Sequence, residues 1–463
     1  MFTRSTKTLL RQTSPRNLLP EFAVQPRQGI FINGGKMKKY SIFALVLILA
    51  ALVVLSALPA SADPVTIKLM MSQTQQPGVS VAVEAFNKAY EGKIVCEADY
   101  LAFDNVFETL EILMSSKSAE YDVFAADGPN IAAYATRGYL TPLTDYITDE
   151  EFAMFTAPMQ AEVTFNGEIY GAAMGDSSLV MYYNTALLEE AGIDYDFAAI
   201  TPDSRITWEE LVAIAKEVQT KIDPDGSRGI IGMEFQQVGR TYQMNVLAND
   251  LGGVNIDETG LNVDGIINAE PWLTALHWYQ DQVNDGVFSK GINASDTSSY
   301  FMADKIVFYF GTTAMPGTFN SNGFDHYGWA YVPYFEGHAD DVTTSCGSWA
   351  VGLNPYSDKK EAAVEFIKYL CIYDGIDVYI NKSGMVPSIT RVYNDELLEA
   401  KPYLKIAQYE GANTALVRAV TPGFNEYATA VNALWENVRN GADVESAAQD
   451  CVDELTTAFM EYE

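Results

Sequence analysis

The stretch VTIKLMMSQTQQPGVSVAVEAFNKAYEGKIVCEADY, residues 65–100, decides the fold. It begins with a strand-like run, Val65–Met71, and ends with a second one, Ile94–Tyr100. Between them, residues 79–90 carry apolar side chains at helical spacing, which predicts a helix with one buried face. A strand, a helix and a strand in this order predict a parallel βαβ unit with a right-handed crossover.

The same alternation continues along the chain. A helix is predicted around residues 106–116 and a third strand at Tyr121–Ala126. Near the C-terminus, apolar residues recur every three or four positions from Val444 to Phe459, which predicts a helix that faces a core. Together these segments predict an α/β fold. The roughly 400 residues after position 62 are too many for one hydrophobic core, so we expect two lobes.

The N-terminal region predicts export. Lys38 and Lys39 precede an apolar run at 42–55, and Ala60-Ser61-Ala62 follows it. This order is typical of a secretory signal peptide, and the run is too short to favour the alternative, a membrane anchor. We expect a signal peptide at 37–62, cleavage after Ala62 and no lipid anchor, since no cysteine follows. Residues 1–36 are interpreted as an upstream extension that does not belong to the natural protein.

The charge restricts the partners. Residues 1–62 hold eight of the 29 basic residues and one of the 61 acidic ones, so the rest carries 21 and 60, a net charge of −39. Such a charge argues against nucleic acid or an anionic membrane as a partner. No histidine or cysteine spacing predicts a metal site or a cofactor. The four cysteines either form two disulfides or stay free and buried: Cys96, Cys346, Cys371 and Cys451.

Short motifs recur in a characteristic order. They are YDVFAAD at 121–127, NGEIYG at 166–171, MYYNTALL at 181–188, TWEEL at 207–211, GSWAV at 347–351 and TPGFNEY at 421–427. In this order the sequence resembles extracellular solute-binding protein family 1, the maltose-binding-like sugar-binding proteins of ABC transporters.

The resemblance implies a periplasmic-binding-protein-like fold of type II, with a ligand cleft between two lobes joined by hinge crossovers. Lobe 1 would comprise 63–172 and 352–397, and lobe 2 would comprise 173–351 and 398–463. The implied function is that of a periplasmic, monomeric, non-catalytic subunit of an ABC importer. It would capture a mono- or oligosaccharide and deliver it to the transmembrane permease subunits.

Candidate ligand contacts follow the predicted strands, where ligands of open α/β sheets bind. Asp127 comes just after the third strand, and its carboxylate can accept hydrogen bonds from sugar hydroxyls; the resemblance also implies a sugar-binding aspartate here. Its alternative role is to cap a helix that begins near Asn130. Further candidates are Gln73 and Gln75 after the first strand, Asp176 after the first crossover and Tyr183 within a strand. Thr312 follows a later strand, and Trp349 lies at the return crossover. Arg418 precedes the TPGFNEY motif, where it either binds the ligand or forms an ordinary surface salt bridge.

Two other functions stay open. Acidic side chains in a cleft would also suit a polyamine or another small cation, whose ammonium groups pair with carboxylates and aromatic faces. A secreted glycosidase with paired carboxylates is less favoured. The sequence has no GxSxG, P-loop or HExxH motif, so no motif of these enzyme classes singles out a catalytic residue.

Overall fold

The predicted βαβ unit is present in the computed structural model, which describes residues 63–462. Strand β1 (Val65–Ser72) leads into helix α2 (Gln76–Ala89) and strand β2 (Ile94–Leu101), and β1 pairs in parallel with β2 along its full length. The predicted signal peptide, its cleavage site and the upstream extension lie outside the described residues.

Nine strands within residues 63–462 form one mixed sheet, in the order β2-β1-β3-β10-β6-β8-β7, with β9 beside β6 and β11 beside β10. Parallel pairing joins β1 to β2 and β3, and β7 to β8. The expectation of parallel pairing does not hold in the middle, where β10 runs antiparallel to β3 and β6, and β6 to β8. The remaining strands are β3 (Val123–Asp127), β6 (Ala172–Asn184), β7 (Ile231–Phe235), β8 (Ile306–Thr312), β9 (Tyr327–Ala330), β10 (Thr344–Leu353) and β11 (Ala415–Leu416), with β4 (Thr164–Phe165) and β5 (Glu168–Ile169) forming a separate pair.

Two large hydrophobic cores and a smaller third cluster share the middle strands. The first core draws its buried side chains from residues 67–174 and 346–407, and the second from 179–335 and 419–459. Strand β6 is buried along its whole length, because its start packs in the first core and its end packs in the second core on one face and, through Val180 and Tyr182, in the third cluster. The first core reaches Ala407, past the predicted lobe limit at 397. The lobe limits themselves stay a prediction.

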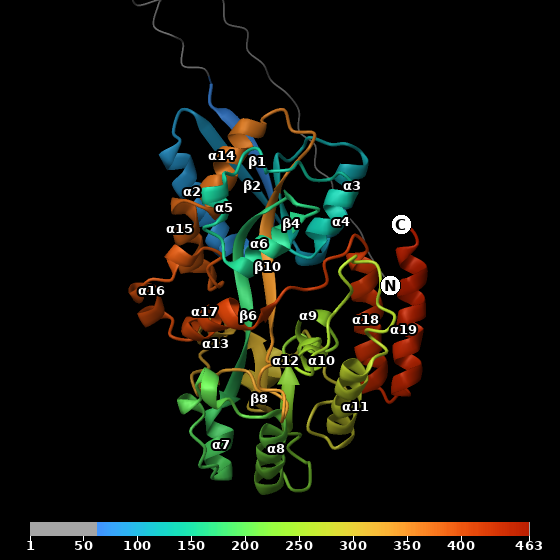
Figure 1. Cartoon of the computed structure of the whole chain (residues 1–463). Coiled ribbons are helices and arrows are strands. Elements are labelled where there is room, and N and C mark those ends of the chain that lie inside the picture. Colours follow the sequence, from blue (N-terminus) through green and yellow to red (C-terminus); the bar gives the residue numbers. More distant parts are fainter. Residues whose placement is uncertain (1–62, 463) are drawn as a thin grey trace, which may run out of the picture. The chain divides into compact units, whose positions relative to one another are not determined.

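Helices pack on the sheet and on each other (Figure 1). Helices α14 and α15 lie against α2, and α18 and α19 pack together beside α11. The predicted apolar stripe of α19 is confirmed, since the apolar residues that form it, from Val444 to Phe459, are buried. The longer helices are α3 (Phe103–Ser115), α8 (Trp208–Ile222), α11 (Glu270–Asn284), α14 (Lys360–Cys371), α15 (Asp374–Ser383), α17 (Leu404–Asn413), α18 (Phe424–Arg439) and α19 (Val444–Phe459). The shorter ones are α4 (Asn130–Thr136), α5 (Asp149–Phe152), α6 (Ala157–Val163), α7 (Thr185–Ala191), α9 (Thr241–Met244), α10 (Val246–Asn249), α12 (Thr297–Met302), α13 (Met315–Ser321) and α16 (Asp395–Ala400).

The four cysteines are free and buried, which decides between the two alternatives that the sequence leaves open. Burial raises the pKa of each thiol. None of the helices in residues 63–462 is long and apolar enough to cross a membrane.

Candidate functional site

Asp127 ends strand β3 and takes part in a partly buried ion pair. It lies opposite Trp349 of β10, so the two side chains share one face of the sheet. Arg418 donates two hydrogen bonds to it, from Nη2 to Oδ1 over 2.8 Å and from Nη1 to Oδ2 over 3.2 Å. The alternative role of Asp127 as a helix cap is not observed, because α4 begins after Pro129 without a side-chain cap.

Arg418 lies in the segment between β11 and α18 and is held from several sides. Its Nη2 lies 3.6 Å from Oε1 of Glu162 on α6, and its guanidinium carbon lies 5.2 Å from the ring centre of Tyr242 on α9. Burial opposes the charge of Arg418, but the carboxylates of Asp127 and Glu162 outweigh it and raise its pKa above the ordinary value. The guanidinium therefore stays charged although only 14% of its side chain is exposed.

Tyr242 packs over the middle strands of the sheet. Its hydroxyl hydrogen-bonds the Oγ of Ser177 on β6, and its ring covers Gly347 of β10 so closely that a Cβ there would collide with it. Ser177 also donates to the carbonyl of Gly347 over 3.2 Å. Burial raises the pKa of the Tyr242 phenol, so it stays a neutral hydrogen-bonding group.

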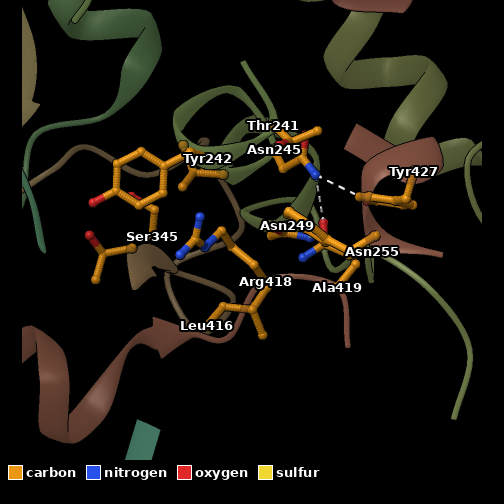
Figure 2. Close-up of a pocket in the computed structure, with 13 residues that line it drawn as sticks. Thr241, Tyr242, Asn245, Asn249, Asn255, Ser345, Leu416, Arg418, Ala419 and Tyr427 are labelled. Carbon is orange, nitrogen blue, oxygen red and sulfur yellow. Dashed lines mark hydrogen bonds between the residues drawn. The ribbon is translucent and has the colours of Figure 1, made fainter. Parts of the chain in front are cut away.

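A small pocket opens beside these residues (Figure 2). Its volume of 20 Å³ is enough for about one water molecule. Two polar atoms at its wall, Nε of Arg418 and Oγ of Ser345, are buried and have no hydrogen-bond partner among the described residues. Buried polar atoms are normally paired, so these two atoms are candidates for hydrogen bonds to a ligand or to water. The other lining residues are Thr241, Tyr242, Asn245, Val246, Asn249, Asn255, Thr344, Leu416, Ala419, Phe424 and Tyr427.

The far side of the pocket is fixed by a hydrogen-bonded amide network. Asn245 donates to Asn255 over 3.0 Å and to the Tyr427 hydroxyl over 3.2 Å, and its Oδ1 accepts from the Trp435 indole over 3.0 Å. These bonds hold α10 against α18. The wall is therefore rigid and uncharged on this side.

An aromatic group adjoins Asp127. Trp349 stacks on Phe107 and meets Phe103 edge to face, with ring centres 6.4 and 5.8 Å apart. Trp349 is 9% exposed, whereas Phe103 at the start of α3 is 43% exposed. Phe103 therefore presents an accessible ring at the edge of the group.

We call the polar part of this region the Arg418 cluster, defined by Asp127, Glu162, Ser177, Tyr242, Ser345 and Arg418. It lies where strands β3, β6 and β10 run side by side, between the two cores.

Sequence comparison identifies the protein family. A profile described as "Bacterial extracellular solute-binding protein" matches residues 72–370. This chain belongs to that family.

Curated relatives of this solute-binding protein match over part of their length. A binding protein of Brucella abortus is 24% identical over 267 residues, which cover 56% of this chain and 60% of the relative. The sn-glycerol-3-phosphate-binding periplasmic protein of Agrobacterium fabrum is 25% identical, over 44% of this chain and 45% of its own. The lactose-binding protein of Rhizobium radiobacter is 23% identical, over 68% of this chain and 74% of the relative.

Solved structures share the fold of this solute-binding protein. The GacH receptor of Streptomyces glaucescens, studied unliganded and with acarbose, has a TM-score of 0.72 and 18% identity, covering 86% of this chain and all of its own. An ABC substrate-binding protein of Listeria monocytogenes, solved with cycloalternan, has a TM-score of 0.73 and 20% identity over the same shares. These two-lobed structures bear out the predicted α/β binding-protein fold.

The predicted site residues of this solute-binding protein fall into two groups. Asp127, Trp349 and Arg418 lie together, as described above. The other five lie in different surroundings. Asp176 is buried and accepts hydrogen bonds from the backbone of Ser177 and Gly347 over 2.6 and 2.9 Å.

Burial raises the pKa of Asp176 to about 7, against those hydrogen bonds and the attraction of Arg418. Tyr183 packs in the second core, tilted against Phe197. Gln75 is buried under the hydroxyl of Tyr379, and Gln73 is exposed. Thr312 is buried, and its backbone N–H donates to Gln236 over 2.8 Å. Ligand contacts by these five residues stay a prediction.

No sequence pattern predicts several members of this region. Tyr242 lies on a four-residue helix that is too short for a periodic pattern. Glu162 and Ser345 are ordinary residues of α6 and β10. Phe103 opens a helix that was recognised, but only the structure places it against Trp349.

Proposed function

We propose that this solute-binding protein is the substrate-binding subunit of an ABC importer and captures a carbohydrate at the Arg418 cluster. The observation that carries the proposal is the partly buried Asp127–Arg418 pair. It connects β3, which packs in the first core, to the segment that leads into α18 of the second core. A ligand bound there touches both cores, as closure around a ligand requires.

The chemistry of the region suits a sugar. Its accessible hydrogen-bonding groups are mostly uncharged hydroxyls and amides, and sugars offer the matching hydroxyl groups. Phe103 supplies an exposed aromatic ring beside Trp349, which lies opposite Asp127, and the C–H face of a sugar packs well on such a ring. The relative named for lactose binding agrees with this choice.

A polyamine is less well supported. A bound ammonium group needs a carboxylate that is free to pair with it, but both oxygens of Asp127 already accept hydrogen bonds from Arg418.

A glycosidase is also less well supported. Asp176, whose pKa is raised to about 7, would suit a general acid, but its side chain is enclosed by β6 and β10.

The rest of the proposal concerns location and partners. We expect a monomer free in the periplasm, released by cleavage after Ala62 and bound transiently by permease subunits. Mass spectrometry of the exported protein should find Asp63 as its first residue. A retained hydrophobic segment would contradict this processing.

Isothermal titration calorimetry with maltose, maltotriose, cyclodextrin, lactose, putrescine and spermidine tests the ligand class. We expect at least one carbohydrate to bind, and the Arg418→Met variant to lose that binding. Binding of a polyamine alone would overturn the choice of ligand. Hydrolysis of a bound sugar by the purified protein would overturn the transport role.

A further inference from the structure

We infer that the Arg418 cluster selects uncharged, hydroxylated ligands and rejects their phosphate esters, and that Asp127 and Glu162 impose this selection. The inference rests on the proposed function and names the substrate class more closely. It is not decided by the relatives, because one is named for lactose and another for sn-glycerol 3-phosphate.

Arg418 is the group that would attract a phosphate. It is the only cationic side chain among the described residues that line the pocket. A guanidinium recognises phosphate or carboxylate by two parallel hydrogen bonds from its forked N–H groups. In Arg418, Nη1 and Nη2 already donate such a pair of hydrogen bonds to the carboxylate of Asp127.

Two carboxylates lie beside the guanidinium of Arg418. Asp127 and Glu162 both lie within 4 Å of it, at 2.8 and 3.6 Å. A second anionic group therefore faces the side of Arg418 that a phosphate would approach. A phosphate dianion would meet this negative charge in a region shielded from water, where charge repulsion is strong.

The part of Arg418 that remains available suits a neutral oxygen. Its Nε, with the Oγ of Ser345, lies at the pocket wall without a hydrogen-bond partner among the described residues. Ser345 is 5% exposed, so its hydroxyl cannot be satisfied by bulk water. One N–H donor beside one hydroxyl matches a sugar hydroxyl, which accepts from the first and exchanges a hydrogen bond with the second.

The remaining walls add no positive charge. Figure 2 shows Arg418 with Tyr242 and Ser345 nearby and with Asn245, Asn249 and Asn255 on the other side of the pocket. The amide of Asn245 is used by Asn255, Tyr427 and Trp435, as described above. A phosphate would therefore lack the several strong donors that compensate it elsewhere in proteins.

The test compares each sugar with its own phosphate ester by calorimetry in a phosphate-free buffer. The pairs are glucose and glucose 6-phosphate, lactose and lactose 6-phosphate, maltose and maltose 6-phosphate, and glycerol and sn-glycerol 3-phosphate. In every pair that binds, we expect the neutral member to bind at least about tenfold more tightly. A phosphate ester that binds as tightly as its neutral partner overturns the inference and leaves the importer role standing. If neither these compounds nor larger maltodextrins bind, the proposed function itself fails, and the inference fails with it.

Two variants assign the selection to its residues. In Glu162→Gln and in Asp127→Asn/Glu162→Gln, the preference for the neutral partner should shrink by about tenfold for each carboxylate removed. The matched control is Asp285→Asn, which removes an exposed carboxylate paired with Lys216 and should leave the preference unchanged. Melting temperatures show that each variant is folded. An unchanged preference in folded Glu162→Gln would show that Glu162 takes no part in the selection against phosphate esters.

Discussion

Asp127 and Asp176 lie on the two strands that flank β10, yet their surroundings are opposite. Asp127 ends its strand and pairs with a guanidinium from a distant segment. Asp176 lies inside the long strand β6, where backbone N–H groups and the Cys346 thiol donate to it. Burial raises the pKa of Asp176 to about 7, so it is partly protonated at neutral pH.

The difference shows that the partner of a buried carboxylate, more than its burial, decides its role. Asp127 is compensated by a side chain from a distant segment of the chain, so a ligand can share or replace that contact. Asp176 is compensated by fixed backbone groups of β6 and β10, so it stabilises the crossing of the strands. The following predictions test this distinction, from the largest effect to the smallest.

Arg418→Met should have the largest effect. It leaves the carboxylates of Asp127 and Glu162 without their cation, which should lower the free energy of unfolding by about 3–5 kcal/mol. Carbohydrate affinity should fall by about a hundredfold or more, because a buried charged contact is lost. Urea unfolding and calorimetry measure the two quantities.

Arg205→Met is the matched control. Arg205 forms a buried, bidentate pair with Glu410, both at 2.8 Å, away from the pocket. The loss of Arg205 should lower the free energy of unfolding by a similar amount and leave the carbohydrate affinity of the folded protein unchanged. Equal loss of affinity in both variants would show that Arg418 acts only on stability.

Asp176→Asn should change the pH dependence of stability. The folded-state pKa of about 7 lies above the ordinary value of 3.8 for aspartate, so between pH 4 and 7 the folded protein holds a proton that the unfolded chain has released. Wild-type stability therefore falls as pH rises through this window. Relative to wild type, the variant should gain about 2–3 kcal/mol between pH 4 and pH 7.

Urea unfolding at several pH values checks this gain. Glu234 and Asp250 have pKa values raised by burial to about 8 and about 7, and their contributions cancel in the comparison. A difference between variant and wild type that does not change with pH would mean that Asp176 titrates normally.

Gly347→Ala should disturb both regions at once. The glycine N–H donates to Asp176, and an added Cβ would collide with the ring of Tyr242. We expect a loss of about 1–2 kcal/mol in stability and weaker ligand binding, because a packed ring must shift. Gly291→Ala is the control, since nothing lies within 4 Å of a Cβ there. Similar thermal unfolding of the two variants would contradict the close packing of Tyr242.

Phe103→Ala should have the smallest effect. The ring is 43% exposed, so stability should change little, whereas carbohydrate affinity should fall about fivefold through the loss of one stacking surface. Tyr300→Ala, which removes a ring of 45% exposure on α12, should leave affinity unchanged. Calorimetry on both variants decides whether Phe103 touches the ligand.

Local patterns predicted much of the fold. The first βαβ unit and the stripe of α19 follow from residue spacing, because their elements are adjacent in sequence. The antiparallel pairing of β6 and β10 could not be predicted in this way. Their partners Ser177 and Gly347 are 170 residues apart, and periodicity carries no information on such pairing.

The site was predicted less completely for the same reason. The sequence predicts Asp127 as a ligand contact after a strand and Arg418 as one before the TPGFNEY motif, but their separation of 291 residues hides the ion pair between them. It also predicts Asp176 as a second candidate carboxylate, in a loop after the first crossover. The structure separates them because β6 continues to Asn184, which places Asp176 inside a strand and not at its end.

The central claim is that a carbohydrate binds at the Asp127–Arg418 pair between the two cores. A crystal structure of the protein with its tightest-binding sugar tests it most directly. The account predicts a sugar hydroxyl within hydrogen-bond distance of Nε of Arg418 and Oγ of Ser345, and a sugar face near Phe103. A sugar bound elsewhere, with the Arg418 cluster and its pocket unchanged, would contradict it.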